Sequence, residues 1–128
     1  MKKILLVVDD ESIVYKALST QFTEEEITIV AATDGESGLK TALELHPDLI
    51  LLDLVMPKMD GLTMLTKLRE DDWGKQANVI VLTNIGEEEK EKEVAEKGID
   101  AYLVKTNWNV LDVAKMVKDI LYLETNKQ

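Results

Sequence analysis

Five short apolar segments, separated by longer stretches of mixed polarity, limit this chain to a small set of folds. Three of the segments are continuous apolar runs with polar residues at both ends, which is typical of strands covered on both faces of a sheet. These runs are residues 4–8, 49–52 and 79–82. The other two, residues 27–32 and 101–104, are less apolar, and we expect them to form the edge strands of the same sheet.

The stretches between the strands place apolar residues at helical spacing. The predicted buried faces are Ile13, Val14, Ala17, Leu18 and Phe22; Leu39, Ala42 and Leu43; Leu62, Leu65 and Leu68; and Val110, Val113, Ala114, Val117, Ile120 and Leu121. The remaining stretch, residues 87–93, is Glu and Lys throughout, and only Val94 and Ala95 offer it apolar anchors. We therefore expect a mostly solvated, weakly held fourth helix. Asp60 is predicted to cap the third helix and Gly98 to end the fourth.

Strands that alternate with helices predict an α/β domain with a parallel sheet and helices on both faces, because parallel neighbours require long right-handed crossovers. With the two mixed segments outside, the doubly wound five-stranded sheet has the flavodoxin-like order 2-1-3-4-5. The length of 128 residues suits a single domain, predicted over residues 1–124, with a polar tail over 125–128. The chain contains no internal repeat and no linker.

Charge and residue usage exclude several classes of function. A formal net charge of −10 repels phosphate backbones and anionic lipid, so direct nucleic-acid contact and membrane contact are not expected. The sequence has 0 Cys and 1 His, which excludes thiolate and multi-histidine metal sites and favours a reducing compartment. The apolar run after Lys2 and Lys3 is too short for a signal peptide or a membrane span, so we expect a soluble, cytoplasmic protein.

Polar residues gather where the strands are predicted to end. In an open parallel sheet the carboxyl ends of the strands meet at one edge, and ligands bind there, near the point where the strand order reverses. The residues that the sequence places at this edge are Asp9, Asp10, Glu11, Asp53, Thr83, Asn84 and Lys105. Their convergence predicts one acidic site built from segments that are far apart in the chain.

The acidic site predicts a divalent cation and an aspartyl nucleophile. Several carboxylates against one lysine leave a negative excess, and hard oxygen ligands favour Mg²⁺. Asp53 is the predicted nucleophile, because it stands alone at the centre of the sheet while Asp9 and Asp10 stand together as a cation clamp. Attack on phosphorus would give an acyl phosphate, with Lys105 and the Thr83 hydroxyl bonding the phosphoryl oxygens.

Together these residues resemble the receiver domain of two-component response regulators, in particular single-domain, chemotaxis-type regulators. The resemblance covers the chain from Lys3 to about Leu123 and rests on five motifs. They are the acidic pair in Val8-Asp9-Asp10-Glu11, the segment Asp53-Leu54-Val55-Met56-Pro57-Lys58-Met59-Asp60-Gly61, the hydroxyl of Thr83, the aromatic Tyr102 and the lysine in Val104-Lys105. Each motif alone is weak, but all five in this order are specific.

The resemblance implies a phosphoryl transfer. Asp53 would receive the group from the phosphohistidine of a sensor histidine kinase or a phosphotransfer protein. Mg²⁺ would be held by Asp10, Asp53 and the backbone carbonyl of Val55, with Asp9 acting through water. Such a domain is mainly a signalling protein, whose chemistry is its own phosphorylation and autodephosphorylation rather than turnover of a metabolite.

The resemblance also implies a switch. Thr83 would move toward the phosphoryl group, and Tyr102 would rotate into the space vacated. Adding about −1.5 to −2 charge creates a new acceptor that can bias a weakly held element, here the charged fourth helix and the loop before it. The fourth helix, fifth strand and fifth helix would then contact a downstream protein or output domain, and the domain is expected to be a monomer or a weak dimer.

Two positions depart from the family pattern. Family members usually have a proline after the lysine, joined by a cis peptide bond, and here Thr106 follows Lys105. The residue after the hydroxyl is usually Ala or Gly, and here it is the larger, polar Asn84. We predict that Asn84, together with Val55 and Ile85, controls access to the site and so the rates of phosphorylation and dephosphorylation.

Three other functions fit parts of the pattern. A magnesium phosphatase of the haloacid dehalogenase type also forms an aspartyl phosphate, but it needs a D-x-D pattern after the first strand and usually a cap, which this chain lacks. A flavodoxin-like electron carrier shares the strand order, but Asp9, Asp10 and Glu11 would repel the FMN phosphate. A phosphorylation-independent receiver-fold interaction module is disfavoured by the intact acidic set. A stand-alone regulator and the N-terminal receiver of a larger regulator both fit the sequence.

Overall fold

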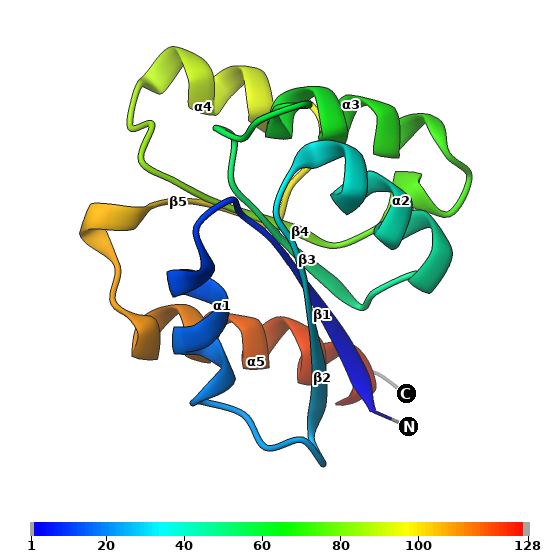
Figure 1. Ribbon diagram of the computed structural model, residues 1–128, viewed down its shortest axis with the longest axis vertical. Helices are drawn as coiled ribbons and strands as arrows, with labels where there is room; N and C mark the ends of the chain where they lie inside the picture. Colours follow the sequence, from blue (N-terminus) through cyan, green and yellow to red (C-terminus); the bar gives the residue numbers. More distant parts are fainter. Residues whose placement is uncertain (1, 127–128) are drawn as a thin grey trace.

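The computed structural model of the protein describes residues 2–126. Within this range, five parallel strands form one sheet in the order β2-β1-β3-β4-β5 (Figure 1). The strands are β1 (Lys3–Val8), β2 (Ile27–Ala32), β3 (Leu49–Leu52), β4 (Val79–Thr83) and β5 (Ala101–Val104). The helices are α1 (Ser12–Ser19), α2 (Gly35–Leu45), α3 (Gly61–Glu70), α4 (Glu88–Ala95) and α5 (Val110–Asn126), with 3₁₀ turns η1 (Gly74–Gln76) and η2 (Lys105–Asn107). The predicted fold class, strand order and edge strands are confirmed.

Helix α5 extends the predicted apolar pattern, which ends at Leu121, as far as Asn126. The last two residues of the predicted polar tail, Lys127 and Gln128, lie outside the described residues. Among the residues that are described, no helix combines the length and the apolar character needed to cross a bilayer.

The helices lie in two layers, with α1 and α5 on one face of the sheet and α2, α3 and α4 on the other (Figure 1). Successive strand residues point to opposite faces, so each central strand contributes to both layers. The side chains that pack with α2, α3 and α4 include Leu6, Val8, Ile50, Leu52, Val79 and Val81. Those that pack with α1 and α5 include Leu5, Val7, Leu49, Leu51, Ile80 and Leu82. This double coverage explains why the three central strands are apolar except at Lys3, the first residue of β1, and Thr83, the last residue of β4.

Three residues that were predicted to be buried are exposed instead. Ile13 is 70% exposed and Leu43 is 36% exposed, and Ala95 is exposed as well. Ile13 lies in the first turn of α1, which follows directly on the end of β1 at the rim of the sheet. Leu43 and Ala95 each follow a fully buried residue, Ala42 and Val94, and adjacent helix positions point about 100° apart. Val94 is therefore the buried anchor of α4.

The predicted N-cap at Asp60 is confirmed, whereas α4 ends at Ala95 with Glu96 as its C-cap, so Gly98 lies in the turn two residues beyond the predicted cap position. The side chain of Asp60 accepts a hydrogen bond of 2.7 Å from the backbone N–H of Thr63, which caps the start of α3. Gly98 has a φ of 77°, and its N–H donates to the carbonyl of Ala95 at 3.0 Å. That left-handed conformation is open to glycine at little cost, so the chain turns here from α4 toward β5.

Two aspartates fix the register between neighbouring strands at the amino edge of the sheet. The backbone N–H of Asp48 donates to the carbonyl of Ile4 at 2.8 Å, and the Asp48 carboxylate accepts from the Ile4 N–H at 2.7 Å. Asp100 makes the same pair of bonds with Val79, both at 2.8 Å. Each aspartate thus satisfies a strand-end donor and acceptor together, which sets where the strands end at the opposite edge.

Two glycines bring helices against the loop that follows β3. A Cβ on Gly61 would lie 2.2 Å from the carbonyl oxygen of Asp53, and the Gly61 N–H donates to the Leu54 carbonyl at 2.9 Å. A Cβ on Gly35 would lie 2.1 Å from the carbonyl oxygen of Met59. Side chains at these positions would push against backbone, so the starts of α2 and α3 can lie this close to the loop only with glycine.

We expect Gly61→Ala to lower the free energy of unfolding by about 1–3 kcal/mol, because the added methyl group can be accommodated only by backbone movement. Gly86→Ala is the matched control, since its nearest new contact would be an ordinary 3.6 Å to a Val104 methyl group, and we expect a change within about 0.5 kcal/mol. Urea titrations of both variants measure the change in the free energy of unfolding. Equal loss of stability in the two variants would contradict the close approach.

Candidate functional site

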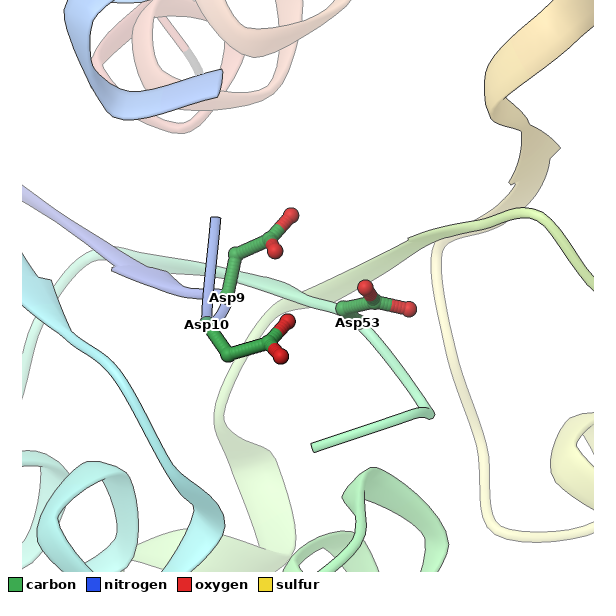
Figure 2. A group of neighbouring side chains, drawn as sticks. All are labelled: Asp9, Asp10 and Asp53. Atoms are coloured by element: carbon green, nitrogen blue, oxygen red, sulfur yellow. The ribbon is translucent and has the colours of Figure 1, made fainter. Parts of the chain in front are cut away.

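Three carboxylates meet at the carboxyl edge of the sheet. Asp9 directly follows β1 and Asp53 directly follows β3. These two strands are paired, with Val8 opposite Leu52, and the Asp53 N–H donates to the Val8 carbonyl at 2.9 Å. Asp10 comes next in the chain, and one oxygen of each of the three carboxylates lies within 4.8 Å of the others (Figure 2). The predicted convergence of these residues is present in the structure.

The three aspartates differ in their exposure. Asp9 and Asp53 are each 6% exposed, whereas Asp10 is exposed. The Asp9 carboxylate accepts from the Glu11 N–H at 2.9 Å, and the Asp53 carboxylate accepts from the Val55 N–H at 3.3 Å. Backbone donors therefore orient both buried carboxylates, while the third reaches in from solvent.

Lys105 enters the site from the end of β5 and contacts both buried carboxylates. Its Nζ lies 2.8 Å from Asp9 Oδ2 and 3.1 Å from Asp53 Oδ2, and 3.9 Å from Glu11 Oε1. The side chain is only 16% exposed. Thr106 follows through a trans peptide, since residues 2–126 contain no cis bond. The lysine thus reaches the pocket with Thr106, rather than a proline, after it.

Burial and ion pairing shift the pKa values of Asp9 and Lys105 in opposite directions. Burial raises the pKa of Asp9, and the charge of Asp53 adds to this, although the bonds from Lys105 and the Glu11 N–H partly offset the rise. For Lys105, burial would lower the pKa, but hydrogen bonds and ion pairs with Asp9 and Asp53 outweigh it and raise the pKa overall. The lysine is therefore held as an ammonium, and three carboxylates against one ammonium leave the pocket negative.

The donor set fits a magnesium ion. Carboxylate and carbonyl oxygens are the hard ligands that Mg²⁺ prefers, and oxygens that share this ion at about 2.0–2.1 Å lie at most about 4.2 Å apart. The three carboxylates, with oxygens within 4.8 Å of one another, need only small rotations to reach that spacing. Val55, the fourth predicted ligand, follows on the same loop as Asp53. The pocket thus combines three neighbouring carboxylates with a residual negative charge. A divalent cation would neutralise that charge.

Thr83 and Tyr102 are joined through the loop that leads into α4. Thr83 ends β4 and is fully buried, and its hydroxyl accepts from the Ile85 N–H over a long 3.4 Å. The Tyr102 hydroxyl donates to the Ile85 carbonyl at 2.7 Å. Burial raises the pKa of Tyr102, with further contributions from Glu91, Glu87 and Asp53. Both predicted switch residues thus hold the same peptide segment.

The predicted access residues lie partly or fully exposed on two neighbouring loops. Val55 is 60% exposed, Asn84 is exposed and Ile85 is half-buried. Val55 lies on the loop after β3, and Asn84 and Ile85 lie on the loop after β4, which is the neighbouring strand. Both loops leave the sheet at the edge where Asp53 lies, and their role in access stays a prediction.

Sequence reasoning missed an apolar surface beside the acidic pocket. A groove of about 240 Å³ between α1 and the start of α5 is lined by Ile13, Ala17, Lys105, Trp108, Val110 and Val113, among others. Ile13, Trp108 and nearby Leu111 are 70%, 38% and 64% exposed. Helical spacing assigned Ile13 to the core, and the only available signal was its place in the first turn of a helix that begins at the rim.

Known proteins similar to this chain agree with the geometry. The family model described as the response regulator receiver domain matches residues 5–118. The transcriptional regulatory protein SrrA of Staphylococcus aureus is 38% identical over 121 residues, which cover 94% of this chain and 48% of that protein. The chain therefore spans about half the length of the curated relatives that it matches.

Two solved structures extend the similarity to the fold. A chain of the CheX–CheY–BeF₃–Mg²⁺ complex from Borrelia burgdorferi is 33% identical, with a TM-score of 0.80 over 92% of this chain and 88% of that one. The receiver domain of AraT, a response regulator from Geobacillus stearothermophilus, is 30% identical, with a TM-score of 0.82 over 100% of both chains. The chain belongs to the response regulator receiver domains, a family that generally uses Mg²⁺ at an acidic pocket and interacts with histidine kinases and output partners.

Proposed function

We propose that this domain is a phosphorylation-controlled signalling receiver, which accepts a phosphoryl group on Asp53 from the phosphohistidine of a sensor kinase or phosphotransfer protein. One observation carries the proposal: Asp53 is buried at the sheet edge beside Asp9, and both accept from the single ammonium of Lys105. This arrangement gives a fixed carboxylate nucleophile together with a cation ready for a second anionic oxygen. The proposal includes a cytoplasmic location, as the sequence predicts.

In the transfer, a carboxylate oxygen of Asp53 forms the new bond to phosphorus as the phosphorus–nitrogen bond of the donor breaks, and the electron pair of that bond stays with the donor imidazole. Lys105 can exchange its bond to Asp53 for one to a phosphoryl oxygen, while its 2.8 Å bond to Asp9 keeps it in place. Mg²⁺, held by Asp10, Asp53 and the Val55 carbonyl with Asp9 through water, would offset the charge that develops on the phosphoryl oxygens.

The switch would act through Thr83. A phosphoryl group on Asp53 adds about −1.5 to −2 charge and strong acceptor oxygens at the sheet edge. The Thr83 hydroxyl accepts a long, weak bond of 3.4 Å from the Ile85 N–H. Its own O–H would donate to a phosphoryl oxygen, and movement of the side chain toward that oxygen would break the bond from Ile85. Release of Ile85 would allow its loop, α4 and Tyr102 to rearrange, and α4, β5 and α5 would present the changed surface to an output partner.

The apolar groove between α1 and α5 is the surface where the phosphoryl donor would dock. It shares Lys105 with the acidic pocket, so a protein seated there lies beside Asp53. The net charge of −10 disfavours a second copy of this chain as the occupant. A partner with an apolar helix face and a basic rim fits better. As a whole, the domain is expected to be a monomer or a weak dimer that contacts no nucleic acid directly.

Beryllofluoride tests the proposal, because with Mg²⁺ it forms a phosphoryl mimic on an aspartate carboxylate. We expect amide shifts in NMR spectra at Thr83, Tyr102 and the residues of α4, lost when Mg²⁺ is chelated. Asp53→Asn removes the charged oxygen at nearly constant shape, and we expect no response from it. No shift in the unmodified protein would contradict the proposal, as would the same shifts in Asp53→Asn.

Asn84 is exposed on the loop directly after β4, and the proposal gives its side chain a role in restricting approach to Asp53. We expect Asn84→Ala to speed both phosphorylation by phosphoramidate and loss of the phosphoryl group, by up to about tenfold, or about 1.4 kcal/mol in each barrier. Gln76→Ala is the control, since Gln76 is an exposed amide in η1, before β4. Unchanged rates in Asn84→Ala would exclude a gating role.

The docking surface predicts a difference between protein and small-molecule donors. With a histidine kinase that phosphorylates the unmodified chain, we expect Ile13→Ser and Trp108→Ser, both in the lining of the groove, each to slow transfer about tenfold, since each loses apolar contact worth about 1.4 kcal/mol. Labelling by phosphoramidate should not change. Leu45→Ser is the control, because Leu45 is 44% exposed at the end of α2, in the other helix layer. Equal effects on both donors would argue against docking at this groove.

A further inference from the structure

The side chain of Arg69, in the last turn of α3, binds four backbone carbonyls. Its Nε donates to the Lys97 carbonyl at 2.9 Å, and its Nη2 donates to the Gly98 carbonyl. Its Nη1 donates to the carbonyls of Gly74 at 2.6 Å and Ala77 at 2.9 Å. The planar guanidinium presents its donors in a rigid fork, and such charge-assisted bonds are stronger than neutral ones. One side chain thus joins the turn after α4 to the segment between α3 and β4.

Further contacts fix the same end of α4. Val94, in the last turn of the helix, is fully buried. The Lys97 N–H donates to the Val94 carbonyl at 3.0 Å, and Gly98 donates to Ala95 at 3.0 Å. Two residues further on, Asp100 is paired with Val79 of β4 by both its backbone N–H and its carboxylate. The carboxyl end of α4 is therefore tied to the buried core, to Arg69 and, through the chain, to the sheet.

The amino end of α4 is held differently. Glu87 stands at the N-cap position with no side-chain hydrogen bond to the helix, and residues 86–89 are exposed. The two bonds described for the preceding loop both involve Ile85, one to Thr83 and one to Tyr102. Around Gly86 the nearest atoms to an added Cβ would be Val104 methyl groups at 3.6 and 3.8 Å, so the backbone there is not tightly enclosed.

We propose that α4 is a hinged lever whose pivot is the turn clamped by Arg69. When the Thr83 hydroxyl moves toward a phosphoryl oxygen and loses the bond from the Ile85 N–H, the amino end of α4 swings, while the carbonyls of Lys97 and Gly98 stay bound to the guanidinium. The amino half of α4 and its N-cap carry Glu87, Glu88, Glu89 and Glu91. When this half moves, the negative charges that an output partner contacts change position. This inference rests on the proposed function, because phosphorylation of Asp53 is what releases the lever.

Amide hydrogen exchange on the full chain, followed residue by residue by NMR with and without beryllofluoride and Mg²⁺, tests the pivot. In the unmodified protein we expect exchange at residues 85–91 to change at least about tenfold, which corresponds to about 1.4 kcal/mol in local opening. Exchange at Lys97 and Gly98 should change by less than about twofold. A comparable change at both ends of α4 would overturn the pivot.

Variants of α3 locate the clamp. Arg69→Lys keeps the charge but loses the rigid fork of donors, and we expect exchange at Lys97 and Gly98 to rise at least about tenfold without ligand. Beryllofluoride should then alter both ends of α4. Lys67→Met, an exposed position on the same helix, should behave as the unmodified protein does. Unchanged exchange at Lys97 and Gly98 in Arg69→Lys would overturn the clamp.

The measurement in the unmodified protein decides the case even if Arg69→Lys proves too unstable to study. It also separates the two proposals. No response to beryllofluoride at any residue would overturn the proposed function and the lever with it. A response around Thr83 that reaches Lys97 and Gly98 as strongly as Ile85 would leave the proposed function standing and overturn the lever alone.

Discussion

The site depends on one shared ammonium group. Lys105 lies 2.8 Å from Asp9 and 3.1 Å from Asp53, and without it two neighbouring buried carboxylates would face each other uncompensated, an arrangement that raises pKa values and favours outward rotation. The three side chains follow the ends of β1, β3 and β5, so the same ion pairs connect three strands at one edge. Because Lys105 has two partners, it can release one of them without leaving the pocket.

The carboxyl edge of the sheet, where the pocket lies, is positioned by contacts at the opposite edge and by helix packing. At the amino edge, Asp48 fixes the start of β3 against β1, and Asp100 fixes the start of β5 against β4. The register of β1 with β3 then brings Asp9 beside Asp53, and Gly61 lets the start of α3 lie against the backbone of Asp53 itself. The positions of the pocket carboxylates therefore depend on sheet register and on helix packing. A change in either would move the carboxylates without changing their charge.

Much of the fold and most of the pocket could be predicted from the sequence, because both follow from periodicity and from the rule that parallel strands end at one edge. The exposure of side chains was predicted less well. Ile13 has the right helical spacing for the core but lies in the first turn of α1, at the rim of the sheet. Helical spacing carries no information on whether another element covers that turn. Arg69 was not predicted at all, since its partners are backbone carbonyls that carry no residue signature. The roles of Thr83 and Tyr102 stay predictions, although the structure joins both to Ile85.

We propose that the Asp53 carboxylate is the group that becomes phosphorylated, with a divalent cation beside it. The most direct measurement is to react the protein with phosphoramidate and Mg²⁺, reduce the product with borohydride, which converts an aspartyl phosphate to homoserine, and sequence the peptides by mass spectrometry. We expect homoserine at position 53 alone, and none when Mg²⁺ is chelated. Homoserine at Asp9 or Asp10, or no conversion at Asp53 in the presence of Mg²⁺, would contradict it.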